Sequence, residues 1–280
     1  MIPISLIYRR LYHRLIGRKM STYFYEPQLQ FLGLSDGRRL AYQKIEGLPS
    51  HPTIIYVPGF TNGKDGEKPK RLVEFCKSMQ YSFIRYDPIC IGDSLGDWST
   101  LEFEDWVESA ATILEQVGSE KNIVIGSSMG GWISSWLATQ PRYKDKIESL
   151  ILIAPAVNFM RPFYASIVEQ LPEEAKDILD RGEIYQIQDE FGTKPMKKSV
   201  AESSAKYELD LQNPIDIECP VRIFHGLADD TISYNCSAFL MEKIKSNDVE
   251  LTFIKTSGHR FDDTKSMSLI EDSILKLAEA

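Results

Sequence analysis

The sequence predicts an α/β fold, in which a mostly parallel central sheet carries helices on both faces. Short apolar runs alternate with longer segments of helical periodicity over most of the 280 residues. The apolar runs are continuous, which is typical of parallel strands buried on both faces. One of them leads directly into a glycine- and serine-rich turn and then a helix, in the stretch IVIGSSMGGW at 123–132.

The first half of the chain supplies a hairpin and two central strands. The stretch FLGLSDGRRLAYQKI at 31–45 predicts the hairpin, with an Asp-Gly turn. TIIYV at 53–57 predicts a short buried strand, and a basic helix at about 68–79 and a strand at 81–87 follow it. Apolar residues on one face predict the next helix: Phe103, Trp106, Val107, Ala110, Ile113, Leu114 and Val117.

The second half continues the alternation and is interrupted once. The predicted elements are strand 121–126, a helix after the serine pair, strand 149–154, strand 221–226, helix 236–245, strand 249–255 and helix 267–279. From about 158 to 213 the alternation stops, and short helical pieces such as 172–181 are broken by glycine and proline. We expect a small helical cap insertion there, over the carboxyl ends of the strands, where open α/β sheets bind ligands.

The cap insertion is rich in aromatic residues. They are Phe159, Phe163, Tyr164, Tyr185 and Phe191. These side chains are expected either to line an acyl pocket or to form a small core of the insertion itself, and the second expectation is slightly favoured.

Composition limits the possible functional classes. A hydrophobic content of 43% supports a sizeable core, and a net charge of −8 gives no basic footprint for nucleic acid. The four cysteines are Cys76, Cys90, Cys219 and Cys236. Their wide spacing suggests neither a zinc site nor a disulfide framework, and favours reduced thiols. No apolar run is long enough to predict a membrane span.

A basic segment precedes the first predicted strand. Its cationic residues are Arg9, Arg10, Arg14, Arg18 and Lys19. Apolar residues recur there at helical spacing, and the first acidic residue of the chain is Glu26. Such a helix is typical of a mitochondrial transit peptide, although a helix lying on a membrane surface or on the protein itself has the same pattern. We expect a leader over 1–28, one α/β domain over 29–280 and a mitochondrial location, with the cytoplasm as the alternative.

The glycine- and serine-rich turn has the pattern Gly-x-Ser-x-Gly, centred on Ser128. A strand enters the turn and a helix leaves it, which is the setting of a nucleophile elbow. Glycine is needed at Gly126 and Gly130, because a β-carbon at either position would clash with neighbouring backbone. Ser127 fits no such frame, because neither residue two places away from it is glycine. We therefore predict Ser128 as a nucleophile.

A serine nucleophile needs a base, and the base needs an orienting carboxylate. The histidines are His13, His51, His225 and His259. Only His259 lies in a loop after a late strand, within KTSGHRFDD. HGLADDTIS offers two acids beyond a strand end; the spacing favours Asp229, and Asp230 is then expected to cap the next turn. Asp262 and Asp263 stand too close to His259, and are expected to be solvated or to cap a helix.

Acyl transfer also needs two amide donors for the oxyanion of the tetrahedral intermediate. We expect one from the Met129 N–H, at the positive end of the helix after the nucleophile. We expect the other from the Phe60 N–H in the turn VPGF, where Gly59 lets the backbone face the site. This chemistry requires no metal and no organic cofactor.

Together these motifs resemble the α/β-hydrolase superfamily. The stretches that carry the resemblance are VPGF, RYDPICIGDSLG, GSSMGGW, HGLADD and GHR. The last three are similar to the branch of mitochondrial α/β-hydrolase-domain proteins described as palmitoyl-protein thioesterases and acyl-glucuronide esterases, with their bacterial relatives. The resemblance implies Ser128 as nucleophile, Asp229 as acid and His259 as base, with a mitochondrial leader and a modest cap. The chain departs from the superfamily pattern at Pro88 and Cys90, where tyrosine and glycine are usual.

The sequence therefore predicts a serine esterase or thioesterase that acts on a small molecule or an acylated protein. Two alternatives stay open. The same fold hosts enzymes that cleave C–C or peptide bonds, and a non-catalytic member would use its pocket only to bind a ligand.

Overall fold

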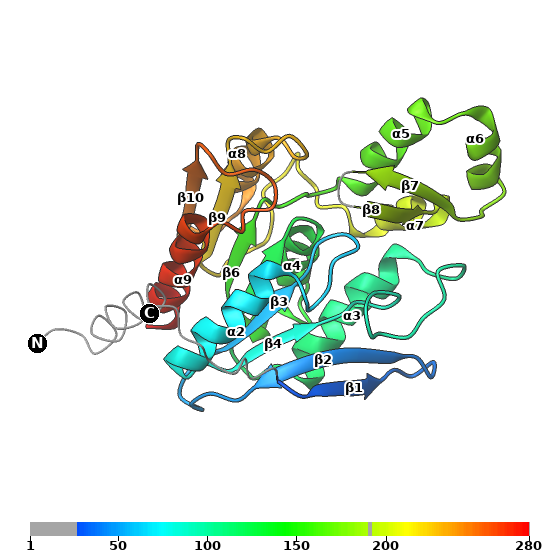
Figure 1. Cartoon of the computed structure of the whole chain (residues 1–280). Helices are drawn as coiled ribbons and strands as arrows, with labels where there is room; N and C mark the ends of the chain where they lie inside the picture. Colours follow the sequence, from blue (N-terminus) through cyan, green and yellow to red (C-terminus); the bar gives the residue numbers. More distant parts are fainter. Residues whose placement is uncertain (1–26, 190–191, 280) are drawn as a thin grey trace, which may run out of the picture.

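The computed structural model describes residues 27–189 and 192–279, which are built around an eight-stranded sheet (Figure 1). The strands are β1 (Leu29–Gly33), β2 (Arg39–Ile45), β3 (Thr53–Val57), β4 (Phe83–Tyr86), β5 (Asn122–Ser127), β6 (Ile147–Ile153), β9 (Val221–Gly226) and β10 (Val249–Ile254). Their order is β1-β2-β4-β3-β5-β6-β9-β10. The β1–β2 and β2–β4 pairs are antiparallel, and all later neighbours are parallel. The mostly parallel sheet is thus confirmed.

Helices cover both faces of this sheet. They are α2 (Glu67–Met79), α3 (Phe103–Gln116), α4 (Met129–Thr139), α8 (Tyr234–Lys243) and α9 (Thr264–Ala278). Successive residues of a strand point to opposite faces. Ile55 and Val57 accordingly join the core under α3 and α4, while Ile54 and Tyr56 join the core under α2 and α9. Among the described helices, none has the length and apolar character to cross a membrane.

Two helices begin earlier than predicted, because side chains just before them cap their first amides. The carboxylate of Asp263 accepts hydrogen bonds from the Lys265 and Ser266 N–H groups, so α9 begins at Thr264. The hydroxyl of Ser233 accepts one from the Asn235 N–H, so α8 begins at the following residue. Of the two acids after His259, Asp263 is therefore the one that caps a helix.

The cap insertion stands above one end of the sheet (Figure 1). Its elements are α5 (Met160–Gln170), α6 (Glu173–Asp180), β7 (Tyr185–Asp189), β8 (Gly192–Met196), α7 (Lys198–Ser203) and the short 3₁₀ turn η2 (Ser204–Tyr207). The hairpin of β7 and β8 is not predicted from the sequence. Its second strand contains Pro195, a residue that argues against a central strand but is tolerated in an isolated pair.

Candidate active site

Ser128 stands between the end of β5 and the first turn of α4, and its backbone is left-handed. Its φ of 54° and ψ of −118° are costly for a residue with a β-carbon. A β-carbon at Gly126 would lie 2.4 Å from the carbonyl oxygen of Gly130. One at Gly130 would lie 2.1 Å from the carbonyl oxygen of Val57. The glycines on both sides of Ser128 are therefore required by sterics, and the turn holds the serine in one conformation.

The neighbouring Ser127 is directed elsewhere. It belongs to β5, is 5% exposed, and its hydroxyl hydrogen-bonds to the buried hydroxyl of Tyr56. Burial raises the pKa of Tyr56 far above its usual value, so this hydroxyl remains neutral. Ser127 thus contributes to the packing of strands β3 and β5, and of the two serines only Ser128 meets His259.

His259 lies between Ser128 and Asp229 and contacts both. Its Nε2 lies 3.0 Å from Ser128 Oγ, and its Nδ1 lies 2.8 Å from Asp229 Oδ2. The imidazole is 21% exposed, and it comes from the loop between β10 and α9. The structure therefore brings the three predicted residues, Ser128, Asp229 and His259, together in one hydrogen-bonded series.

The carboxylate of Asp229 is fully buried in the loop after β9. Burial alone would raise the pKa of Asp229. The hydrogen bonds from His225, His259 and the Ile232 N–H outweigh burial and hold the pKa of Asp229 well below its usual range. Asp229 is therefore ionised near neutral pH, as an acid that orients a histidine must be.

Asp230 does not make the contacts expected of it. We predicted that its side chain caps the turn that follows, but Asp229 Oδ1 accepts from the N–H groups of Thr231 and Ile232, at 2.9 and 2.8 Å. Within residues 27–189 and 192–279, the exposed Asp230 makes a single 3.4 Å contact, with the Thr231 hydroxyl. One carboxylate, that of Asp229, thus closes the turn with one oxygen and meets His259 with the other.

A second histidine, which the sequence did not single out, contacts the same carboxylate. His225, in β9, is fully buried, and its Nε2 lies 3.0 Å from Asp229 Oδ2. The only signal in the sequence is its place just before the loop that carries the acid.

The two expected oxyanion donors flank Ser128. A β-carbon on Gly59 would lie 3.2 Å from the Ser128 β-carbon, so the turn that carries Phe60 lies directly against the nucleophile. Met129 is the first residue of α4, where an amide has no acceptor within its own helix. In the described part of the chain, neither the Phe60 nor the Met129 N–H donates a backbone or side-chain hydrogen bond. Both remain available to a negatively charged oxygen at the site.

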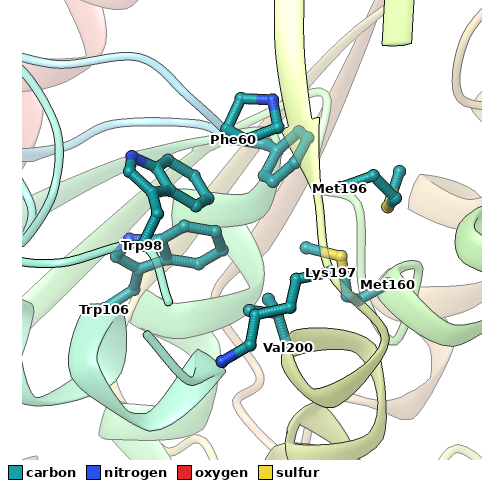
Figure 2. A pocket seen from close by; sticks show the side chains of 8 residues that line it. Phe60, Trp98, Trp106, Met160, Met196, Lys197 and Val200 are labelled. Carbon is teal, nitrogen blue, oxygen red and sulfur yellow. The ribbon is translucent and has the colours of Figure 1, made fainter. Parts of the chain in front are cut away.

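A narrow apolar cavity, almost filled by its own lining side chains, lies beside Phe60, between the sheet and the cap insertion (Figure 2). Its lining is Phe60, Trp98, Trp106, Met160, Pro195, Met196, Lys197 and Val200. The Trp106 ring meets the Phe60 ring edge-on, with centroids 5.6 Å apart. The side chain of Phe60, whose N–H is one of the two expected oxyanion donors, is therefore part of an apolar wall.

Some aromatic residues of the cap insertion lie against Phe60, and others form a small core of the insertion itself. Phe159 and Phe163 meet the Phe60 ring edge-on, at 6.4 and 6.1 Å. Phe163 also packs with Tyr164 and Tyr185 on a small core of the insertion, formed by Leu179, Ile187 and Met196. Phe191 lies outside the described residues. The small core is thus present, and Phe159 and Phe163 connect it to the wall around Phe60.

The loop after β4 keeps a left-handed turn despite its unusual sequence. Cys90 has a φ of 66°, which explains why the superfamily pattern has glycine at this position. At the start of the same loop, Asp87 accepts hydrogen bonds from the N–H groups of Lys64 and Asp93, at 2.8 and 2.9 Å. The buried ammonium of Lys64 lies 3.0 Å from the same carboxylate. Asp87 thereby joins this loop to the one that carries Phe60.

Comparison with known proteins agrees with this architecture. The family model described as "Serine aminopeptidase, S33" matches residues 53–261. The mitochondrial palmitoyl-protein thioesterase ABHD10 of Mus musculus is 31% identical over 261 residues, which are 90% of this chain and 84% of that protein. The solved structure of alpha/beta hydrolase domain-containing protein 10 from mouse has a TM-score of 0.78 at 30% identity, over 90% of this chain and 98% of that one. A putative hydrolase from Agrobacterium vitis S4 has a TM-score of 0.79 at 25% identity, with the same coverage.

These similarities confirm the expected fold and the resemblance read from the motifs. The chain belongs to the serine aminopeptidase S33 family and has the α/β-hydrolase fold.

Proposed function

We propose that this protein is a serine hydrolase that cleaves carboxylic esters or thioesters through an acyl-enzyme on Ser128. The observation that carries the proposal is the series of hydrogen bonds from Ser128 through His259 to Asp229, at 3.0 and 2.8 Å. A protein that only binds a ligand needs no base beside a serine. The geometry therefore favours catalysis over a binding role.

In the first half of the reaction Ser128 Oγ attacks the acyl carbonyl while His259 Nε2 takes its proton. Asp229 accepts the Nδ1–H bond, holds the tautomer and stabilises the imidazolium. The N–H groups of Phe60 and Met129 stabilise the oxyanion. The carbon–oxygen or carbon–sulfur bond then breaks, and His259 gives its proton to the departing alkoxide or thiolate.

Water completes the cycle. His259 takes a proton from the water as its oxygen attacks the acyl-enzyme, and the Phe60 and Met129 amides hold the second oxyanion. The bond to Ser128 Oγ breaks, the carboxylic acid leaves, and the serine recovers its proton from His259. No step consumes a cofactor.

The proposed substrate carries an apolar acyl group on a small molecule or on a protein. Relatives are named palmitoyl-protein thioesterases, and the cavity beside Phe60 is lined mainly by aromatic and methionine side chains. In this proposal the catalytic domain spans 29–280, and the cap insertion, at about 158–213, forms one wall of the acyl site. Cleavage of a peptide bond is the second candidate, favoured by the description of the family model.

The proposed location is the mitochondrion. The names of the relatives include it, and the basic amphipathic segment within 1–28 has the composition of a transit peptide. That segment up to residue 26 lies outside the described residues. Fractionation of cells, with N-terminal sequencing of the recovered protein, tests both the location and the cleavage of the leader.

The activity is tested with paired oxygen esters, thioesters and anilides, over acyl groups from acetyl to palmitoyl. We expect ester and thioester hydrolysis in the wild type, a loss of at least about 10⁴-fold in Ser128→Ala, and a change of less than about threefold in the matched control Ser127→Ala. A fluorophosphonate should label the wild type and Ser127→Ala but not Ser128→Ala. Full activity in Ser128→Ala would refute the mechanism, and turnover of anilides alone would favour the peptidase candidate.

A further inference from the structure

The carboxylate of Asp229 is held by two imidazoles, not by one. His225 Nε2 lies 3.0 Å from Asp229 Oδ2, the oxygen that also meets His259 Nδ1 at 2.8 Å. The proposed reaction uses His259 as its base and assigns nothing to His225. Yet His225 is a fully buried polar side chain in direct contact with the acid.

The surroundings of His225 fix which ring nitrogen carries a proton toward Asp229. Nε2 faces two acceptors, Asp229 Oδ2 and the carbonyl oxygen of Ile232, each at 3.0 Å. Two acceptors cannot both contact a bare nitrogen lone pair, so Nε2 carries a hydrogen and donates. On the other side, Nδ1 lies 2.6 Å from the hydroxyl of Ser237. This buried serine of α8 fixes the plane of the ring.

Both carboxylate oxygens of Asp229 therefore accept two hydrogen bonds each. Oδ1 accepts from the backbone N–H groups of Thr231 and Ile232, and Oδ2 accepts from His225 and His259. The two amides anchor one oxygen but leave the other free to swing about it. His259 comes from a separate loop and has to move protons during turnover, so it cannot itself define the position of Oδ2. A donor built into a central strand can.

We propose that His225 is a positioning residue, which holds Asp229 Oδ2 where His259 Nδ1 needs it. The inference rests on the proposed function, because it acts only through Asp229 and His259. At metal sites, groups that orient the ligating side chains typically change affinity or activity by about 10- to 100-fold when removed. His225 is expected to act within that range, and on kcat more than on KM.

The test uses a matched pair of polar substitutions. In His225→Gln the side-chain amide nitrogen can take the place of Nε2 and still donate to Asp229. In His225→Asn the shorter side chain places the amide near the Nδ1 position, beside Ser237, and out of reach of Asp229. We expect kcat to fall by about 10- to 100-fold in His225→Asn, with KM within about twofold, and to stay within about threefold of wild type in His225→Gln.

A double-mutant cycle separates positioning from general damage to the fold. If His225 acts through Asp229, then His225→Asn should change kcat by less than about twofold in an Asp229→Ala background. Equal losses in both backgrounds, or an unchanged kcat in the single variant, would overturn the inference. If His225→Asn lowers the melting temperature so far that it is not folded under assay conditions, Ser237→Ala replaces it in the cycle with the same expected dependence on Asp229. Ser128→Ala is assayed in parallel, because its retained activity would refute the proposed function itself, whatever the His225 variants do.

Discussion

Gly59 lies so close to Ser128 that the turn carrying Phe60, the proposed oxyanion loop, has no free space for a side chain at residue 59. A β-carbon on Gly59 would stand 3.2 Å from the Ser128 β-carbon and 3.1 Å from the carbonyl oxygen of Ser127. Both contacts are tighter than side chains usually adopt, and one of them is to backbone. The position of the Phe60 N–H relative to Ser128 is thus set by the absence of a side chain at residue 59.

Gly59→Ala is therefore expected to displace the oxyanion loop by a few tenths of an ångström without unfolding the protein. Loss of one oxyanion donor costs about 10²–10³ in kcat, and a displaced donor should cost less, about 10-fold. Steady-state kinetics on the best ester substrate measures it. Gly33→Ala is the control, because a β-carbon there meets nothing within 4 Å. If the two variants have the same kcat, the loop does not supply a donor.

The adjacent acids Asp229 and Asp230 should differ sharply when each is changed to asparagine. Asp229→Asn is expected to lower kcat by about 10⁴-fold, because the amide no longer favours the required tautomer of His259. The side chain of Asp230 is exposed and meets the Thr231 hydroxyl at 3.4 Å, so Asp230→Asn should stay within about twofold of wild type. Kinetics of the two purified variants decides the assignment, and the opposite ranking would assign the acid to Asp230.

The charge of Asp229 should persist well below neutral pH. Burial opposes ionisation of Asp229, but its hydrogen bonds keep its pKa well below the usual value. A lowered pKa in the folded state means that the stability contributed by Asp229 is present above its unfolded value of about 3.9, and is lost only as the pH falls through the folded value. Between about pH 4 and neutrality Asp229 therefore stays charged and contributes no step of its own to the pH profile.

Asp229 is accordingly expected to add no inflection to log(kcat/KM) between about pH 4 and neutrality. Initial rates at subsaturating substrate, over buffers of constant ionic strength, give this profile. A slope of two in this range would show that more than one group titrates there, against the expectation that Asp229 stays charged.

The ion pair between Lys64 and Asp87 should matter mainly for stability. Both side chains are nearly inaccessible, at 4% and 2% exposure, and they lie 3.0 Å apart. Lys64→Met removes the buried ammonium that Asp87 shares with Asp65 and Asp93, and breaking a buried ion pair typically costs about 3–5 kcal/mol in the free energy of unfolding. Urea denaturation measures this. Lys121→Met removes the exposed pair with Glu148 and should leave the denaturation midpoint unchanged, so equal shifts in the two variants would contradict this account.

Much of the fold could be predicted because its signals are local. Continuous apolar runs predict strands such as β3 and β6 in any surroundings, and the glycines around Ser128 indicate a turn with no room for side chains. The contact of Asp229 with His259 agrees with the prediction made from its place just after a strand end. In each of these cases the sequence pattern and the structure that it predicts lie within a few residues of each other.

Other features depend on contacts between distant segments, and no local pattern announces them. Lys64 meets Asp87 from 23 residues away, because two loops converge after neighbouring strands. The contact between His225 and Asp229 spans few residues (i, i+4), but it forms inside a loop where Ile232 and Ser237 also bind the imidazole, and no local sequence pattern indicates that arrangement. The β7–β8 hairpin was missed for another reason: its composition is poor in strand-forming residues, and pairing within the cap insertion overrides it.

The walls of the cavity beside Phe60 differ in how freely they could change over evolution. The indole N–H groups of Trp98 and Trp106 donate to the backbone of the loop after β4, at 3.1 Å each, so replacing either ring would also loosen that loop. Met160, Met196 and Val200 contribute only apolar surface from the opposite side. A new preference for the acyl group should therefore arise by exchange of residues in the cap insertion. The two tryptophans should stay the same in variants that act on different substrates.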